Sequence, residues 1–312
     1  MKIGIDLGGT KTELVMLSDD GLEVFRKRVI SARTYAGALD VMTSLVTEAE
    51  QEVGVTATVG VGIPGVISPV SHLVKNANST WLNGHPLDSD LTARLGRTVR
   101  VANDANCFAL SEATDGAGAG ANTVFGVILG TGCGAGFVTG GKVHRGVNAV
   151  AGEWGHNPLP WMTESEFRSR QCFCGKYDCI ETFISGPALV SDYQDADQHS
   201  HNTQLNLSTV LRVEDIMARL AGGDAVAQAV FERYIDRLAR ALGHVINLLD
   251  PDVIVLGGGV SNISALYGEL ASRLPSCTVG GECRTQVVPN LYGASSGVRG
   301  AAWLWNDAEG IA

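Results

Sequence analysis

Three of the chain's seven cysteines gather in one short stretch. The segment CFCGKYDC contains Cys172, Cys174 and Cys179, and the segment GEWGH before it supplies His156. Three thiolates and one imidazole complete a tetrahedral shell for Zn²⁺ and leave no position open for a catalytic water. The sequence therefore predicts a structural zinc site, and a zinc-bound His156 would fix the loop that carries Glu153.

Two alternatives to this ligand set remain open. His199 and His201, in the segment HSH, could replace His156 as the fourth ligand. The cysteines could also be structural thiols, or Cys172 and Cys174 could form a disulfide. A reducing cytosol disfavours the disulfide, and the polar residues between Cys174 and Cys179 argue against burial of free thiols.

Two aspartates stand where a strand is expected to meet a turn. In VRVANDANCFALSEA we expect a strand at Val99–Ala102 and then a helix, with Asp104 at the turn between them. Asp104 could simply cap that helix, which is worth about 1 kcal/mol. At the carboxyl end of a strand it could instead be the general base that accepts a proton from a substrate hydroxyl. Asp6, in DLGGT, is either an ordinary turn residue or a carboxylate that holds hydrated Mg²⁺.

Two segments share the order strand, Gly/Thr turn, strand. They are KIGIDLGGTKTELVML at residues 2–17 and VFGVILGTGCGAGFV at residues 124–138. Glycine backbone and a threonine hydroxyl can donate hydrogen bonds to phosphate oxygens. The duplication predicts two related lobes whose phosphate cradles face each other across a cleft. In DPDVIVLGGGVSN, a strand at Val253–Leu256 ends in three glycines against which a nucleoside could lie.

Two loops carry side chains suited to a sugar. GVGIPGVISP (residues 60–69) and KNANSTWLNGHPL (residues 75–87) are rich in Gly, Asn and Pro, and amide groups can meet both the donors and the acceptors of sugar hydroxyls. On composition alone, ordinary loops are the favoured interpretation of both segments.

The remaining elements alternate between helix and strand, which is typical of an α/β fold with a mixed sheet in each lobe. Apolar spacing predicts helices at residues 36–53, 224–249 and 263–274 and a closing helix at residues 295–305. The polar segment at residues 193–207 is expected to be a surface loop. The small-residue run DGAGAGAN suggests a lobe boundary near residues 107–120.

Composition excludes several classes of protein. The 312 residues are 45% hydrophobic and 18% charged, with a net charge of -10. This argues for a globular protein and against nucleic acid or an anionic membrane as partners. The start of the chain lacks the apolar run of a signal peptide, so we expect a cytoplasmic protein.

Taken together, DLGGTK, NDAN, LGTGCGAG, GEWGH, CFCGKYDCIE and VLGGG resemble the ROK family of bacterial sugar kinases and repressors, in the family's order along essentially the whole chain. The resemblance implies a two-lobed actin-like ATPase (ribonuclease H-like) fold with mixed sheets flanked by helices and a ligand cleft between the lobes. It further implies phosphoryl transfer from ATP, with Mg²⁺, to a sugar hydroxyl.

The resemblance also assigns roles to residues. It makes Asp104 the base and His156, Cys172, Cys174 and Cys179 the zinc ligands. The residues expected at the sugar are Gly65, Asn78, Asn103, Asp104, Glu153, His156 and Glu181. Those expected at the nucleotide and its Mg²⁺ are Asp6, Gly8, Gly9, Thr10, Lys11, Gly130, Thr131, Gly132, Gly257, Gly258 and Gly259. The first lobe is expected at residues 1–115, completed by residues 295–312, and the second at residues 116–294.

Some details differ within the family. The usual Gly before the third cysteine is Asp178 here, a residue that tolerates left-handed φ better than most. Family repressors carry a DNA-binding segment before the first strand, whereas here the first hairpin starts at Met1. The segments NANSTWLNG and AGEWGHNPLPWM resemble the fructokinase that also accepts mannose, which makes fructose the expected substrate.

Other readings of the substrate and function stay open. NDANCFALSE is shared with N-acetylglucosamine kinases, so an N-acetylglucosamine kinase, a glucokinase and a non-catalytic sugar-binding regulator are alternatives. We expect a homodimer, from the family resemblance and from exposed Trp303 and Trp305.

Overall fold

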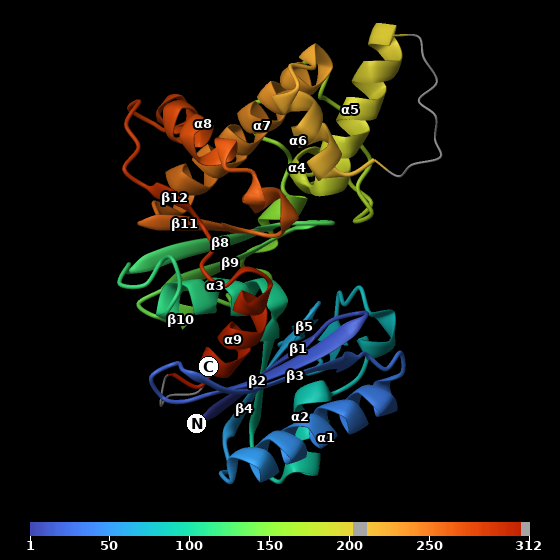
Figure 1. Cartoon of the computed structure of the whole chain (residues 1–312), viewed down its shortest axis with the longest axis vertical. Coiled ribbons are helices and arrows are strands. Elements are labelled where there is room, and N and C mark those ends of the chain that lie inside the picture. Colours follow the sequence, from blue (N-terminus) through green and yellow to red (C-terminus); the bar gives the residue numbers. More distant parts are fainter. Residues whose placement is uncertain (202–210, 307–312) are drawn as a thin grey trace. The chain divides into compact units, whose positions relative to one another are not determined.

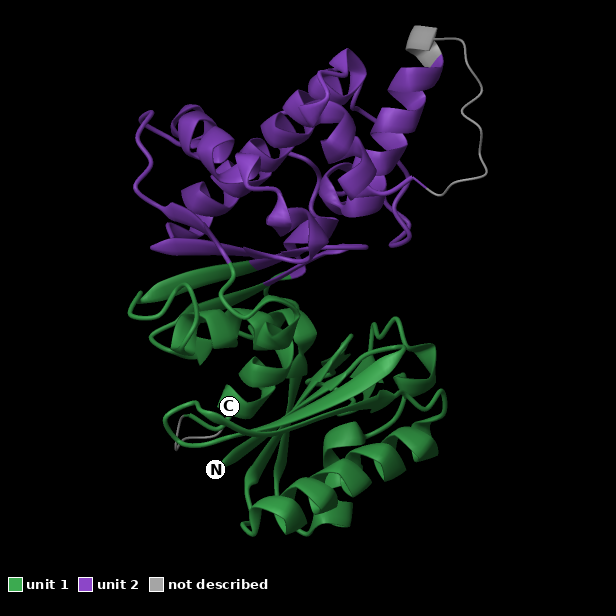
Figure 2. Cartoon of the chain, in the orientation of Figure 1, with its two compact units in different colours: residues 1–126, 136–152, 290–312 green, residues 127–135, 153–289 purple. Residues whose placement is uncertain are grey.

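The computed structural model describes residues 1–201 and 211–306, which form two compact units (Figures 1 and 2). Unit 1 comprises residues 1–126 and 136–152 and the chain from Asn290 onwards, and unit 2 comprises residues 127–135 and 153–289. The first lobe was expected to end at residue 115, but unit 1 also includes residues 116–126 and 136–152. The reason is packing: a Cβ at Gly126 would lie 2.8 Å from the Cα of Ala109, and one at Gly136 would lie 2.6 Å from the carbonyl oxygen of Ala105.

Unit 1 is built on a mixed five-stranded sheet. Its order is β3 (Glu23–Ile30), β2 (Lys11–Leu17), β1 (Lys2–Leu7), β4 (Thr58–Ile63) and β7 (Val99–Asn103). The first Gly/Thr segment forms the expected hairpin, in which β1 and β2 pair antiparallel. Strands β1, β4 and β7 run parallel, so their carboxyl ends meet at one edge. A short hairpin of β5 (Val66–Ile67) and β6 (Val74–Lys75) follows β4.

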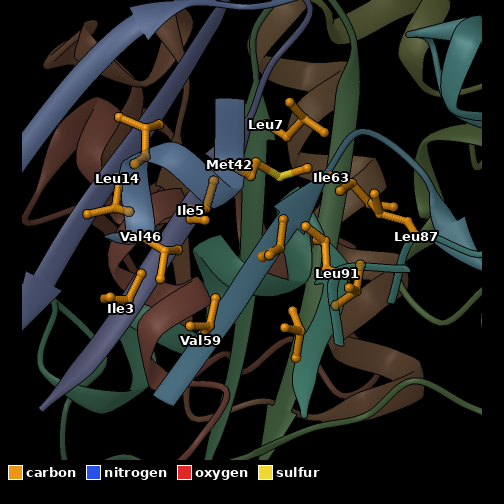
Figure 3. Close-up of a cluster of buried hydrophobic side chains, with 14 of the residues drawn as sticks. Ile3, Ile5, Leu7, Leu14, Met42, Val46, Val59, Ile63, Leu87 and Leu91 are labelled. Carbon is orange, nitrogen blue, oxygen red and sulfur yellow. The ribbon is translucent and has the colours of Figure 1, made fainter. Parts of the chain in front are cut away.

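One face of this sheet carries the apolar core of unit 1 (Figure 3). Successive side chains of a strand point to opposite faces, so Ile3, Ile5 and Leu7 of β1 lie on the same side. They pack with residues of α1 (Tyr35–Val53) and α2 (Leu87–Leu95). The long helix expected at residues 36–53 is thus confirmed, with Thr34 as its N-cap.

On the other face of the sheet, glycines of β1 and β4 let helices approach the backbone directly. A Cβ at Gly60 would lie 1.9 Å from the carbonyl oxygen of Ala301, and one at Gly4 would lie 2.0 Å from that of Val298. Both contacts belong to α9 (Ser296–Trp303), the expected closing helix. Helix α3 (Asp104–Thr114) packs beside it, close to Gly62 of β4 and to Gly126 and Gly136 of the second sheet.

The second sheet is also mixed. Its order is β10 (Lys142–Val143), β9 (Cys133–Thr139), β8 (Thr123–Leu129), β11 (Val253–Gly257) and β12 (Gln286–Pro289). The second Gly/Thr segment lies between β8 and β9, as expected. The α-helices of unit 2 are α4 (Glu181–Ile184), α5 (Gly186–His201), α6 (Val213–Ala221), α7 (Ala225–Leu249) and α8 (Ala265–Arg273). The helix expected at residues 224–249 is α7, and Asp224 is its N-cap.

Two expectations fail. The segment expected to be a loop from Tyr193 is helical as far as His201, because α5 has a buried side that includes Tyr193; residues 202–207 lie outside the described residues. Trp303 is buried, and Trp305 donates a hydrogen bond from Nε1 to the carbonyl oxygen of Val59 at 2.7 Å. These tryptophans therefore do not support a homodimer, which stays a prediction. Within residues 1–201 and 211–306, no helix is both long and apolar enough to cross a bilayer.

Candidate active site and metal centre

The expected residues of unit 1 gather at the carboxyl ends of its three parallel strands. Asp6 pairs with Gly62 in the register of β1 and β4, and Ile63 pairs with Asn103 in the register of β4 and β7. Helix α3 begins at the next residue, Asp104. Open α/β sheets place ligand groups at this edge.

The two residues at the start of α3 share the capping of the helix. Asn103 is the N-cap, and its Oδ1 accepts a hydrogen bond from the amide of Ala105 at 2.9 Å. Asp104 is the first helical residue, and its Oδ1 also accepts from that amide, at 2.8 Å. The capping alternative considered for Asp104 thus holds in part, because Asp104 and Asn103 share the amide of Ala105. A carboxylate in the first turn is further stabilised by the helix dipole.

Asp6 lies near Asp104. Burial raises the pKa of Asp6, the charges of Asp104 and Glu13 raise it further and Arg28 lowers it, with a net value of about 7. Burial likewise raises the pKa of the Cys107 thiol, with contributions from both Asp6 and Asp104. Two nearby carboxylates, of which Asp6 has a raised pKa, are a suitable environment for a divalent cation, which would stabilise both charges.

The two expected sugar loops meet beside Asn103. The Nδ2 of Asn103 donates to the carbonyl oxygen of Gly65 at 3.3 Å, and the amide of Asn78 donates to that of Pro64 at 3.2 Å. A Cβ at Gly65 would lie 2.9 Å from Ala77, which explains the glycine. The structure thus brings together Gly65, Asn78 and Asn103.

The Gly/Thr turn of unit 1 is held by a residue that sequence reasoning missed. Ser31 donates from its hydroxyl to the carbonyl oxygen of Gly8 at 2.7 Å and from its amide to that of Thr10 at 3.0 Å. Gly9, Thr10 and Lys11 are exposed. The turn also lies near the second of the two expected sugar loops, because a Cβ at Gly9 would be 3.4 Å from Ser79 Oγ.

A hollow opens in unit 1 next to Asn103. It is small, with a cavity volume of about 10 Å³, and its lining residues are Val66, Ile67, Val101, Ala102, Asn103, Asn106, Arg145 and Ala149. Asn106 is buried, and its Oδ1 has no hydrogen-bond partner within the described part of the chain. The hollow thus combines apolar walls with an unused amide acceptor and a guanidinium group.

In unit 2, the predicted zinc ligands come together. His156, Cys172, Cys174 and Cys179 place one ligand atom each within 4.8 Å of one another. Cys172 Sγ lies 3.6 Å from His156 Nδ1, and Cys174 Sγ lies 3.5 Å from Cys179 Sγ. Ligands about 2.3 Å from a central Zn²⁺ are roughly 3.8 Å apart in a tetrahedron, so these spacings fit the ion.

The chemistry of the donor set fits a cation as well. All three cysteines are free in this structure, as a metal site requires and a disulfide does not. Burial raises the pKa of Cys179 to about 12, so its thiolate needs a compensating positive charge, which a bound Zn²⁺ would supply. His156 faces Cys172 through Nδ1, which leaves Nε2 on the opposite side of the ring. The side chains of His199 and His201 lie outside the part of the chain whose side chains are described.

The loop of residues 172–179, called the metal loop below, differs from the family pattern at Asp178, where glycine is usual. The φ of Asp178 is 61°, the left-handed conformation expected at this position. Its carboxylate is buried and accepts from the amides of Arg168 and Arg170, at 2.5 and 3.1 Å. The aspartate thus adopts the conformation usually supplied by glycine and adds two hydrogen bonds that glycine cannot make.

A buried ionic network connects residues 166–170, just before the metal loop, to helices α5 and α7. Arg237 and Arg240 of α7 donate to Glu166, at 2.8 Å for Arg237 Nε and 3.0 Å for the nearer Arg240 contact. Arg237 also donates to Asp192 of α5 at 2.5 Å, and Asp192 accepts from Arg170. No sequence pattern predicts this network, since its members come from separate elements.

Glu153 and His156 belong to one 3₁₀ turn, η2 (Glu153–His156). Its middle residues Trp154 and Gly155 are buried, and a Cβ at Gly155 would lie 2.2 Å from the carbonyl oxygen of Cys133. Close packing against the start of β9 therefore fixes the turn, while Glu153 stays exposed.

The expected nucleotide segments of unit 2 are neighbours. Gly258 has a φ of 82°, and a Cβ there would lie 2.3 Å from the carbonyl oxygen of Leu129, the last residue of β8. The turn Gly130–Gly132 follows immediately and is contacted by Glu181, whose Oε2 accepts from the amide of Cys133 at 2.8 Å. Thr131 and Gly259 are exposed. The two glycine segments thus share one end of the second sheet.

Comparisons with known proteins agree with this arrangement. The sequence model of the ROK family matches residues 2–308. The N-acetyl-D-glucosamine kinase of Salmonella gallinarum is 40% identical over 309 residues, which cover 97% of this chain and 99% of the relative.

Among solved structures, the ROK hexokinase of Thermus thermophilus has a TM-score of 0.83 at 27% identity and 97% coverage of both chains. A ROK family glucokinase from Streptomyces griseus, solved with glucose and AMPPNP, has a TM-score of 0.76 at 30% identity, with 97% of this chain and 98% of that chain covered. The expected α/β fold class, with mixed sheets flanked by helices as in the actin-like ATPases, is confirmed.

Proposed function

The chain belongs to the ROK family and is a sugar kinase, and from this premise we propose that it transfers the γ-phosphoryl group of MgATP to the 6-hydroxyl of N-acetylglucosamine. The observation that carries the choice of sugar is the 40% identity to an N-acetyl-D-glucosamine kinase over nearly the full length of both chains. The fructose preference suggested by two loop segments has no support in these comparisons, and N-acetylglucosamine replaces it here.

The hollow beside Asn103 supports an acetamido sugar. Its walls Val66, Ile67 and Ala149 suit a methyl group, the buried Oδ1 of Asn106 can accept from an amide N–H, and Arg145 can donate to a carbonyl oxygen. Fructose has no group with this combination of apolar and amide character.

Asp104 is the proposed general base. Its carboxylate accepts the proton of the 6-hydroxyl as that oxygen bonds to the γ-phosphorus and the bond between γ-phosphorus and the bridging oxygen to ADP breaks. Asp6, whose buried carboxylate has a raised pKa, is the proposed partner of the hydrated Mg²⁺ that accompanies ATP. Asn103, Gly65 and Asn78 hold sugar hydroxyls, because these residues meet at the strand ends beside Asp104.

The other roles divide between the two units. In unit 2, exposed Thr131 and the backbone of Gly130 and Gly132 cradle phosphate oxygens, Gly257, Gly258 and Gly259 lie against the nucleoside, and Glu153, His156 and Glu181 bind sugar hydroxyls. In unit 1, Gly8, Gly9, Thr10 and Lys11 bind phosphate, since that turn is exposed and carries a cation. The cluster of His156 and three cysteines holds a structural Zn²⁺, which would supply rigidity to the loop that carries Glu153.

The test is an ADP-release assay over N-acetylglucosamine, glucose, mannose and fructose. We expect the highest kcat/KM with N-acetylglucosamine; a higher value with fructose or mannose would contradict the proposed substrate. A wild-type protein that binds a hexose but releases no ADP with any of the four would instead be a sugar-responsive regulator.

Asp104→Asn tests the mechanism in the same assay. The loss of a general base lowers kcat by about 10²- to 10⁴-fold while the affinity for AMPPNP stays nearly unchanged. Asp20→Asn, at an exposed turn, is the matched control and should keep full activity. If Asp104→Asn kept more than about a tenth of the turnover, Asp104 would not be the base.

A further inference from the structure

Glu181 contacts the phosphate turn of its own unit. Its Oε2 accepts a hydrogen bond from the amide of Cys133 at 2.8 Å, and Cys133 directly follows the turn Gly130–Gly132. A Cβ at Gly132 would lie 2.6 Å from the same oxygen. The carboxylate therefore lies directly against the backbone of the turn, where a Cβ at residue 132 would displace it.

A second hydrogen bond holds the other end of the turn. The amide of Gly186, at the start of α5, donates to the carbonyl oxygen of Gly130 at 2.9 Å. The turn closes on itself through the amide of Gly130, which donates to the carbonyl oxygen of Gly132 at 3.0 Å. Residues 181–186 thus hold both ends of the turn, and the amides of Thr131 and Gly132 are not needed for either bond.

The same segment is anchored to the metal loop. Thr182 donates to the carbonyl oxygen of Cys179 from its amide at 2.9 Å and from its hydroxyl at 2.7 Å. Ile180 donates from its amide to the carbonyl oxygen of Asn157, the residue after His156, at 2.9 Å. Tyr234 of α7 donates to the carbonyl oxygen of Ile184 at 2.8 Å. The segment is therefore fixed from both sides, and Glu181 lies two residues beyond a proposed metal ligand.

A carboxylate beside a phosphate site is unfavourable by charge alone, since both groups are negative. Its hydrogen bond to the turn therefore indicates a positional role, because a bond between an amide and an ionised carboxylate is stronger than a neutral one. Removing the carboxylate would free the amide of Cys133 and loosen the turn before any phosphate arrives.

We propose that Glu181 is a positioning residue for the nucleotide: its hydrogen bond to Cys133 shapes the phosphate turn, so nucleotide affinity depends on Glu181 even when no sugar is present. This inference rests on the proposed role of the turn in phosphate binding. It goes beyond a contact between Glu181 and the sugar, and it joins the metal loop to the nucleotide site within unit 2.

The experiment measures the affinity of the full-length protein for AMPPNP with Mg²⁺ and without sugar, by calorimetry. We expect Glu181→Ala to weaken this affinity by about fivefold or more, the lower end of typical coupling between sites. Glu181→Gln keeps an oxygen that can accept from Cys133 and should stay within about twofold. Glu153→Ala is the control, since Glu153 is also proposed to bind sugar and has no described contact with the turn.

Two outcomes would overturn the proposal. One is a Glu181→Ala variant that keeps its fold and its bound metal and binds AMPPNP as tightly as the wild type. The other is measured on the wild type alone by NMR hydrogen exchange, so it is independent of folding defects and of kinase activity. We expect the amide of Cys133 to be protected from exchange. Exchange as fast as that of an exposed turn amide would exclude the hydrogen bond.

Discussion

The buried carboxylate of Glu166 should make unit 2 sensitive to acid. Burial alone would raise the pKa of Glu166, but hydrogen bonds from Arg237 and Arg240 and from the amide of Thr163 lower it, to about 2. A carboxyl group whose pKa is lowered by folding stabilises the protein above its unfolded pKa, and that stability is lost as the pH falls through the folded pKa. For Glu166 the loss falls between about pH 4.5 and 2.

The size of the effect follows from the same values. The difference between 4.5 and about 2, at about 1.4 kcal/mol for each factor of ten, corresponds to about 3 kcal/mol. Only 8% of the Glu166 side chain is exposed, so little solvent screening reduces this value. Breaking a buried ion pair by removing one partner costs about 3–5 kcal/mol, which agrees.

The perturbation is Glu166→Gln, and the assay is urea unfolding followed by circular dichroism from pH 7 to pH 2. We expect the variant to be about 3 kcal/mol less stable than the wild type at pH 7 and the difference to shrink toward zero near pH 2. Both proteins carry the same Cys/His cluster, so any loss of metal in acid cancels in the difference.

The control for this experiment is Glu48→Gln. Glu48 forms an ion pair with Lys27 at the surface, where 44% of its side chain is exposed, so its replacement should change stability by less than about 0.5 kcal/mol. A Glu166→Gln variant within about 1 kcal/mol of the wild type at pH 7, or a difference that does not change with pH, would refute the reasoning.

Two further predictions concern the metal and the packing of α9. Cys174→Ser removes one ligand of a closed site, so elemental analysis should find zinc in the wild type and little in the variant, which should also melt at a lower temperature; a wild type without zinc would contradict the site. Gly60→Ala places a methyl group 1.9 Å from the carbonyl oxygen of Ala301 and should destabilise unit 1 by about 1–3 kcal/mol or more in thermal unfolding. The matched Gly268→Ala, where a Cβ meets nothing within 4 Å in a helix, should be neutral or stabilising by up to about 1 kcal/mol; equal effects at both glycines would exclude the close approach of α9.

Features that depend on neighbouring residues were predictable from the sequence. Helices α1 and α7, which were predicted from their apolar spacing, lie where they were expected, and so do both Gly/Thr hairpins. The Cys/His cluster could be found because three of its four members lie in one loop of eight residues, CFCGKYDC. Even the left-handed conformation of Asp178 follows from its residue type and position.

The polar sequence of α5 shows where such reasoning fails. Composition indicated a loop from Tyr193, yet the chain there is helical because Tyr193 is fully buried and Asp192 pairs with Arg170 and Arg237. A segment with weak local preference takes its conformation from its partners, and those partners are not marked in its own sequence.

The sequence by itself determined most of the elements, the members of the Cys/His cluster and the family, because each depends on periodicity or on residues close together in the chain. Only the tertiary structure decided that Ser31 holds the first Gly/Thr turn, that Glu181 holds the second and that the glycines of β1 and β4 receive α9. These contacts join residues far apart in the chain, and a hydroxyl, a carboxylate or a glycine carries no local sign of its distant partner. Folding brings them within hydrogen-bond or van der Waals distance, and the shape of the site depends on those contacts.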